Sequence, residues 1–273
     1  MAVFLAVVVA LGWFISYYYN SPFILYIAIV LSVAMNIVSY WNSDKIVMRL
    51  SGASLLNPES DREFYRIVEN LAITAGLPIP KIYIINDPAP NAFATGRDKN
   101  HSAIAVTTGL RAMLDKAELE GVVAHELAHI GNRDTLLQTA VVVLVGLISI
   151  LADFFIRSHA FGGRGENRGG PLAVIGVIFI ILSPIVATVI QLAISRKREF
   201  LADATASLMT RYPEGLAGAL RKISSYGRPM AKAHNATAHL FISNPFGGRT
   251  LSGLARIFST HPPVEDRIKA LLG

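Results

Sequence analysis

His125-Glu126-Leu127-Ala128-His129 is the stretch from which the architecture and the chemistry of this 273-residue chain follow. Residues four apart on an α-helix lie on one face, so both imidazoles can reach a single metal ion. Glu126 follows the first histidine and points away from it, which suits a general base acting on water at the metal. The alternative is a solvated helix with two unrelated histidines, and the spacing favours the zinc site.

The flanks of the pentapeptide predict that it lies on a helix. Apolar residues recur at helical spacing from Leu114 to Ile130. Asp115 is the expected N-cap and Gly131 the expected C-cap.

A catalytic zinc site usually has three protein ligands and leaves a fourth position to water. The chain has no cysteine, so the third ligand must be His, Asp or Glu. The best candidate is Glu199, in the segment REFLAD (198–203), which lacks Gly and Pro and should be helical. Asp203, one turn later, is placed to accept a hydrogen bond from a ligand imidazole and so fix its tautomer. An exposed helix with ordinary charged neighbours is the competing interpretation.

Four long apolar runs predict transmembrane helices. Mean hydropathy is +0.46 and only 16% of residues are charged, against about 25% in soluble domains. The runs are 2–19, 23–40, 136–156 and 172–194, each about 18–23 residues, enough for a hydrocarbon core of roughly 30 Å. A cleavable signal peptide competes for the first pair, but a basic start and a small-residue cleavage site are missing. A buried hairpin competes for the later pair.

The predicted spans constrain where a metal site can assemble. His125 and His129 precede the third run and Glu199 follows the fourth. All three lie on one side of the bilayer if both runs span it, or if neither does, and we expect the metal close to the membrane surface. Basic residues near the membrane ends favour a cytoplasmic site. They are Lys45, Arg49, Arg133, Arg196, Lys197 and Arg198 on the catalytic side, against Arg157, Arg164 and Arg168 on the other.

The segments outside these runs predict an α+β fold that is predominantly helical. Before the metal helix we expect a helix at 61–75 and strands at 81–86, 91–95 and 103–107, the last two joined by a turn at 96–100. The stretch NAFATG (91–96) is the best candidate for an edge strand that holds a peptide substrate as an added strand. Later, 212–215 should break a helix and 216–223 should form another.

We expect four parts along the chain. They are an N-terminal transmembrane hairpin (1–41), the first half of the catalytic domain with the sheet and the metal helix (42–134), a second transmembrane pair (135–194), and the second half of the catalytic domain with the third ligand (195–273).

Two further groups of residues are candidates for a site. His234 and His239 have no carboxylate at helical spacing, which disfavours a metal site there. His261-Pro262-Pro263 is followed by Arg267, and the prolines suit the start of a helix. A cationic or hydrogen-bonding side chain at a zinc site can stabilise an oxyanion, so His261 or Arg267 is a candidate, with a helix cap and a surface arginine as the alternative.

With these residues in place, the chain resembles the HtpX family of membrane zinc endopeptidases, which is related to the prenyl-protein peptidases. The resemblance covers nearly the whole chain. Its motifs, in order, are an N-terminal transmembrane pair, NAFATG (91–96), HELAH (125–129), a second apolar pair, REFLADATA (198–206) and STHPPVEDRI (259–268). The resemblance implies a zincin-like (gluzincin) catalytic domain with four transmembrane helices.

The resemblance also implies roles for the matching residues. It implies that His125, His129 and Glu199 bind one zinc ion (Zn2+) per chain and that Glu126 is the catalytic base. It further implies that Asp203 supports the ligands, that Asn91 belongs to the edge of the cleft, and that His261 and Arg267 assist at the oxyanion.

The predicted protein is a zinc-dependent integral membrane endopeptidase, multi-pass in the cell (inner or plasma) membrane, with a cytoplasmic catalytic domain. The resemblance implies quality control of misfolded or damaged membrane proteins, with protein substrates and the lipid bilayer as partners. A homo-oligomer is left open, and nucleic-acid motifs are absent from the sequence.

Two other classes of protein compete with this prediction. A zinc-stabilised membrane scaffold or holdase would bind metal without cleaving, and Glu126→Gln would distinguish it from the protease. A small-substrate transporter is disfavoured, because the apolar runs have essentially no ionisable residues at mid-membrane.

Overall fold

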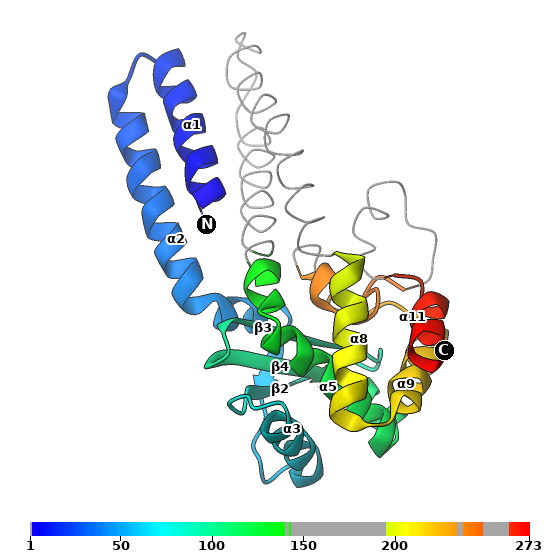
Figure 1. The fold of residues 1–273 in the computed structure, drawn as a ribbon. Coiled ribbons are helices and arrows are strands. Elements are labelled where there is room, and N and C mark those ends of the chain that lie inside the picture. Colours follow the sequence, from blue (N-terminus) through cyan, green and yellow to red (C-terminus); the bar gives the residue numbers. More distant parts are fainter. Residues whose placement is uncertain (1, 140–141, 143–194, 234–236, 248–261) are drawn as a thin grey trace. The chain divides into compact units, whose positions relative to one another are not determined.

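The computed structural model describes residues 2–139, 142, 195–233, 237–247 and 262–273 (Figure 1). The chain divides into two compact units, one that includes residues 1–42 and one that includes 43–139 and 192–273. Most of the runs predicted to span at 136–156 and 172–194 lies beyond the described residues. The elements are α1 (Ala2–Tyr18), α2 (Pro22–Leu50), β1 (Ala53–Leu55), α3 (Arg62–Thr74), β2 (Lys81–Ile85), β3 (Ala92–Asp98), β4 (His101–Thr107), α4 (Thr108–Met113), α5 (Lys116–Gly131), α8 (Arg196–Thr210), α9 (Pro213–Ser225), η1 (Ala238–Leu240) and α11 (Val264–Leu272).

The first unit contains an apolar helical hairpin, formed by α1 and the first part of α2. The turn between them uses Asn20 in a left-handed conformation, with φ of 49°. A Cβ atom on Gly12 would collide with the side chain of Ala28, so glycine is needed for this close approach of the two helices. In the part of the chain that is described, Pro22–Asn42 is the one helical segment long and apolar enough to cross a membrane, with a mean hydropathy of 2.2 over its most apolar part. α1 is shorter, at 17 residues.

The second unit is built on a four-stranded mixed sheet in the order β1-β2-β4-β3. β2 and β4 are parallel, whereas β1 pairs with β2 and β3 with β4 in antiparallel fashion. This order places β3 at an edge, as predicted for residues 91–96. The ladder between β3 and β4 shifts register between Gly96 and Asp98, and a Cβ on Gly96 would collide with the carbonyl oxygen of His101.

The helix that carries the pentapeptide, α5, is the centre of this unit (Figure 1). It contacts β3 and α3 on one side and α8 and α9 on the other, and its residues from Leu119 to Ile130 are buried apart from Glu120. A helix that is covered all round is apolar all round except where polar groups are paired. Close contact with α9 requires Gly121, because a Cβ there would lie 2.6 Å from the backbone nitrogen of Leu216.

The ends of α5 test the predicted caps. Asp115 is the N-cap, and its side chain and that of Glu118 form a capping box. The predicted C-cap was wrong by one residue: Gly131 is the last helical residue and Asn132 is the cap. Arg133 then takes a left-handed φ of 62°, which turns the chain into a second helical segment at 134–139.

Other predictions of elements were largely confirmed. α3, β2, β3, β4, α8 and α11 lie where the sequence placed helices and strands. The segment 212–215 was predicted to break a helix; α8 ends just before it, at Thr210, and Pro213 already occupies the first turn of α9. Proline is favoured there because the first-turn N–H has no partner within the helix. β1 and α4 were not predicted from the sequence.

Candidate metal centre

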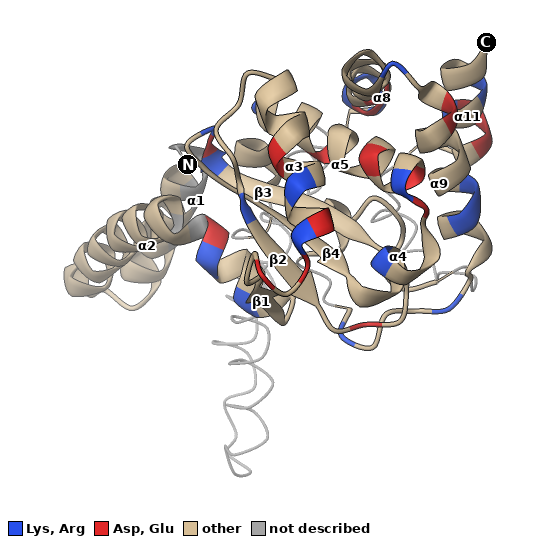
Figure 2. Ribbon diagram, turned by 90° about the horizontal axis from the view of Figure 1, so that it is seen from below, with Lys and Arg blue, Asp and Glu red and all other residues tan. Residues whose placement is uncertain are grey.

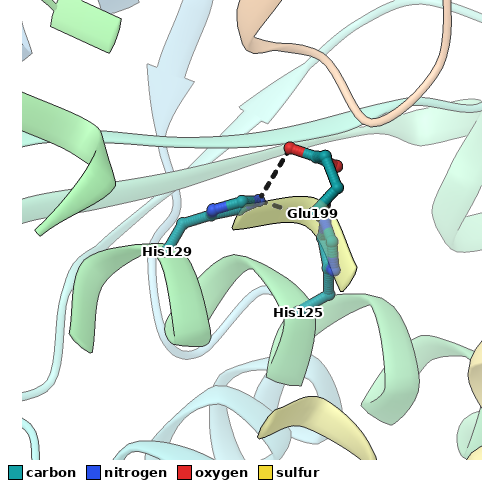
Figure 3. A group of neighbouring side chains, drawn as sticks. All are labelled: His125, His129 and Glu199. Carbon is teal, nitrogen blue, oxygen red and sulfur yellow. Dashed lines mark hydrogen bonds and ion pairs between the residues drawn. The ribbon is translucent and has the colours of Figure 1, made fainter. Parts of the chain in front are cut away.

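Three side chains from two helices meet at one point (Figure 3). His125 and His129 lie one turn apart on α5, with their Nε2 atoms 3.2 Å from each other. Glu199 approaches from α8, with Oε1 at 3.6 Å from Nε2 of His129 and Oε2 at 3.7 Å from Nε2 of His125. All three side chains are buried.

The donor set fits a tetrahedral zinc ion. Zinc takes imidazole nitrogen and carboxylate oxygen at about 2.0–2.2 Å, so two ligands of one tetrahedral ion lie roughly 3.3–3.5 Å apart. The three ligand atoms here lie within 4.8 Å of one another, and the separations of 3.2, 3.6 and 3.7 Å bracket that spacing. Two imidazole lone pairs and a carboxylate aimed at one buried point require a cation or a proton between them.

The Nδ1 atom of each imidazole lies within hydrogen-bond distance of an aspartate. Nδ1 of His125 lies 2.9 Å from Oδ1 of Asp203, and Nδ1 of His129 lies 3.0 Å from Oδ2 of Asp134. When Nδ1 carries the proton and donates it to a carboxylate, Nε2 is left with the lone pair that binds metal.

Each aspartate is in turn paired with an arginine. Arg267, on α11, donates to both carboxylate oxygens of Asp203 at 2.9 and 2.6 Å and is fully buried. Arg198, on α8, donates to Asp134 at 2.7 Å, with 39% of its side chain exposed. The two histidines therefore have equivalent carboxylate–arginine pairs behind them, one buried inside the unit and one open to solvent.

The electrostatics of the two histidines differ. Burial, together with the positive charges of Arg267 and His129, lowers the pKa of His125 to about 4. Burial also acts to lower the pKa of His129, but the hydrogen bond to Asp134 and the negative charges of Glu199 and Glu126 outweigh it and raise that pKa to about 9. The pKa values of the two histidines are therefore shifted in opposite directions.

Glu126 is buried, with 2% of its surface exposed. Its negative charge contributes to raising the pKa of both His129 and Arg267, although burial opposes the shift in each case. It therefore lies beside the cluster without belonging to the three-residue metal group.

Asn91 lies immediately before β3, and its side chain forms hydrogen bonds with a loop that is distant in sequence. Its side chain accepts a hydrogen bond from the backbone nitrogen of Ser243 at 3.1 Å and donates one to the carbonyl of the same residue at 2.9 Å. The backbone nitrogen of Ile242 also donates to the carbonyl of Ala92 at 2.9 Å. Asn91 thus fixes the beginning of the edge strand.

The remaining site candidates fall in different places. His261 is outside the described part of the chain. His239 is buried and bonds through Nε2 to the carbonyl of Gln138 at 3.1 Å, and it does not belong to the described metal cluster. Sequence reasoning missed Asp134 and Arg198. Asp134 lies just after the pentapeptide, but its approach depends on the left-handed Arg133, which the sequence did not signal.

Two helical histidines, a glutamate from a second helix and a buried glutamate beside them define a zinc metalloprotease of the HExxH class. The chain belongs to peptidase family M48, whose sequence profile matches residues 58–273.

Relatives extend over nearly the full chain. A "Protease HtpX homolog" of Caldanaerobacter subterraneus subsp. tengcongensis is 47% identical over 280 residues, covering 99% of this chain and 92% of the relative. Another "Protease HtpX homolog", of Pyrococcus furiosus, is 48% identical over 247 residues, covering 90% of this chain and 84% of that protein. The resemblance to HtpX proteases is thereby confirmed.

A solved structure shares the fold. The crystal structure of S. mikatae Ste24p matches with a TM-score of 0.54 at 20% sequence identity. The match covers 92% of this chain and 59% of that one, so this chain spans less than two thirds of Ste24p. The described residues agree with the predominantly helical α+β class.

Proposed function

We propose that His125, His129 and Glu199 hold the catalytic zinc and that Glu126 is the general base of peptide-bond hydrolysis. The observation that carries this proposal is the convergence of two Nε2 atoms and one carboxylate at a buried point. Both Nδ1 atoms face carboxylates, so both imidazoles are oriented for a metal and not for each other.

Zinc, when bound, acts as a Lewis acid on water and on the scissile carbonyl. Glu126 takes the proton from the attacking water and delivers it to the leaving amine. Asp203 and Asp134 keep the ligand imidazoles in the tautomer that exposes Nε2. Arg267 and Arg198 hold the two aspartates in place by donating hydrogen bonds to their carboxylates.

Arg267 and His261 are proposed to assist at the oxyanion. Two nitrogens of Arg267 are engaged by Asp203, while its Nη1 lies 4.0 Å from Oε2 of Glu199. Nη1 is therefore the donor of this side chain that could serve a carbonyl oxygen bound at the metal site.

The edge of β3 is proposed to hold the substrate backbone. The carbonyl of Asn91 accepts from Thr107 on β4, whereas that of Ala92 accepts from Ile242 on the outer side. Because backbone groups alternate along a strand, Ala94 and Gly96 direct theirs to the outer side as well. An extended peptide can pair there as an added strand, with Asn91 fixing the start of this edge.

We propose a multi-pass arrangement in the cell membrane, with four transmembrane helices and a cytoplasmic catalytic domain. The four parts are 1–41, 42–134, 135–194 and 195–273. The apolar hairpin of the first unit and the basic residues flanking the predicted spans support this arrangement. Its substrates would be misfolded or damaged membrane proteins that present extended segments near the membrane surface. A homo-oligomer is compatible with this arrangement.

Glu126→Gln and Glu199→Ala test the assignment when metal content and casein cleavage are measured together. Glu126→Gln should lose cleavage and keep one zinc per chain, because the residue is not a ligand. Glu199→Ala should lose both. Full metal occupancy in Glu199→Ala would remove it from the ligand set, and unchanged cleavage by Glu126→Gln would exclude it as the base.

A further inference from the structure

The positive charge of this chain is concentrated in one segment. Residues 215–264 contain six Lys and Arg, namely Arg221, Lys222, Arg228, Lys232, Arg249 and Arg256, and no Asp or Glu. The formal net charge of the whole chain is +6, so the rest of the sequence is balanced. Figure 2 marks part of this charge in blue on α9.

The same segment supplies most of the wall of a cavity of about 490 Å³. Apolar side chains of α9 and of the loop after η1 line it, among them Leu220, Ile223 and Ile242. The charged side chains in its described lining are all arginines: Arg196, Arg228 and Arg267. A volume of this size is in the range of pockets that take a ligand, and it holds one or two amino-acid side chains.

The cavity adjoins both the candidate metal centre and the edge strand β3. Arg267 lines it and also places Nη2 at 3.4 Å from Nδ1 of His125. Asn91, which immediately precedes the edge strand β3, lines it as well. A peptide that lies along β3 with its scissile bond at the metal would therefore pass the mouth of this cavity.

The three arginines that line the cavity differ in whether an acidic side chain is paired with them. Arg267 is paired with Asp203. Within the described residues, the guanidinium groups of Arg196 and Arg228 have no hydrogen-bond or ion-pair partner, and both residues are exposed. Glu265 and Asp266 are exposed on the first turn of α11 and do not line the cavity.

We propose that this cavity is a specificity pocket that accepts an acidic side chain, Asp or Glu, of the peptide substrate. Its apolar wall packs against the methylene groups, and Arg196 and Arg228 face the carboxylate. The inference rests on the proposed protease function. An anionic lipid headgroup shares the charge, but a concave cavity beside the metal centre and the start of β3 suits a side chain of a bound peptide better than a bilayer surface.

The test uses the full-length zinc-loaded enzyme in zwitterionic detergent, where anionic lipid is absent. Fluorogenic peptides carry Glu, Gln or Lys in turn at each position around the scissile bond. At one position we expect Glu to exceed Gln in kcat/KM by about three- to tenfold, the range of one or two partly exposed ion pairs. The preference should shrink in high salt, because exposed charges are screened.

Charge reversal identifies the residues responsible. Arg196→Glu and Arg228→Glu should remove or invert the preference for Glu over Gln at that position. Arg228→Lys should retain most of the preference. Arg221→Glu is the matched control, because it makes the same change of charge on α9 at a residue that does not line the cavity.

Three outcomes would overturn the proposal. They are the absence of any position that favours Glu, an equal loss of preference in Arg221→Glu, and a preference that arises only when vesicles containing anionic lipid replace the detergent. The last result would assign the charge to the membrane. Loss of cleavage of every peptide by the wild-type enzyme would instead count against the protease function itself.

Discussion

Asp134→Asn and Asp203→Asn are expected to weaken zinc binding by different amounts. Both aspartates accept Nδ1–H of a ligand histidine, at 3.0 and 2.9 Å, and both also accept from an arginine. An asparagine offers one oxygen, so its amide group must face one of the two donors. The size of the loss depends on whether the arginine can move away.

Exposure of the arginine sets the magnitude in each case. Removing the group behind a metal-bound histidine typically costs about 10–100-fold in metal affinity, or about 1.4–2.7 kcal/mol. Arg198 is 39% exposed and can turn its guanidinium into water, so Asp134→Asn should cost about tenfold. Arg267 is 1% exposed and cannot, so Asp203→Asn leaves a buried cation poorly paired and should approach a hundredfold loss.

Competition with a chromophoric zinc chelator measures both affinities. Metal-free protein is titrated in parallel for wild type, the two variants and Glu126→Gln, which changes a buried carboxylate that is not a ligand and should keep zinc affinity within about threefold. If Asp134→Asn weakens binding as much as Asp203→Asn, the exposure of the arginine does not set the loss. If neither variant moves the affinity beyond twofold, the aspartates do not act through the histidines as described.

Three further outcomes follow from the geometry of the second unit. Gly121→Ala should lower the free energy of unfolding by about 1–3 kcal/mol, because the new Cβ meets the backbone of Leu216 at 2.6 Å; urea unfolding measures it, and an unchanged midpoint would refute the close contact. Zinc binding should release about one proton at pH 7 and tighten as pH rises toward about 9. The reason is that burial, which lowers the pKa of His129, is outweighed by Asp134, Glu199 and Glu126, so that the metal-free pKa is raised to about 9. Calorimetry in buffers of different ionisation enthalpy counts the released proton, and a count of zero would contradict the assignment. The pKa of Asp61 is lowered despite partial burial, by its hydrogen bonds to Arg111 and to the backbone nitrogen of Phe64. The contribution of Asp61 to stability is therefore present above the unfolded pKa of about 3.9 and lost as pH falls through the folded pKa. Arg111→Ala should flatten this part of an acid-unfolding curve, and an unchanged curve would count against the stabilising role of this ion pair.

Local patterns in the sequence were enough for most elements of the second unit. Asp115 and Glu118 specify the start of α5 through a capping box. Asp61 is the N-cap of α3 and accepts a hydrogen bond from the backbone nitrogen of Phe64. Alternating and β-branched residues placed β2, β3 and β4. β1 was missed because three residues carry too little pattern, and it exists only through its pairing with β2.

The candidate site divides in the same way. His125, His129 and Glu126 are neighbours on one helix, so spacing alone relates them. Glu199 was predicted because a chain without cysteine must use His, Asp or Glu as a third ligand, and because its segment should be helical. The packing of α8 against α5 brings Glu199 to the histidines. Asp134 was not predicted, because its contact with His129 depends on the left-handed conformation of Arg133.

The sequence by itself determined the metal chemistry, since helical periodicity aligns the two histidines and no cysteine competes as a ligand. It also determined the apolar hairpin at the N-terminus, since hydropathy is a local property. Only the tertiary structure decided the contact of Asp134 with His129, the pairing of Asp203 with Arg267, and the arginine-lined cavity beside them. Asp203 meets a residue 64 positions away in Arg267, and such contacts depend on how α5, α8 and α11 pack, which no local pattern encodes.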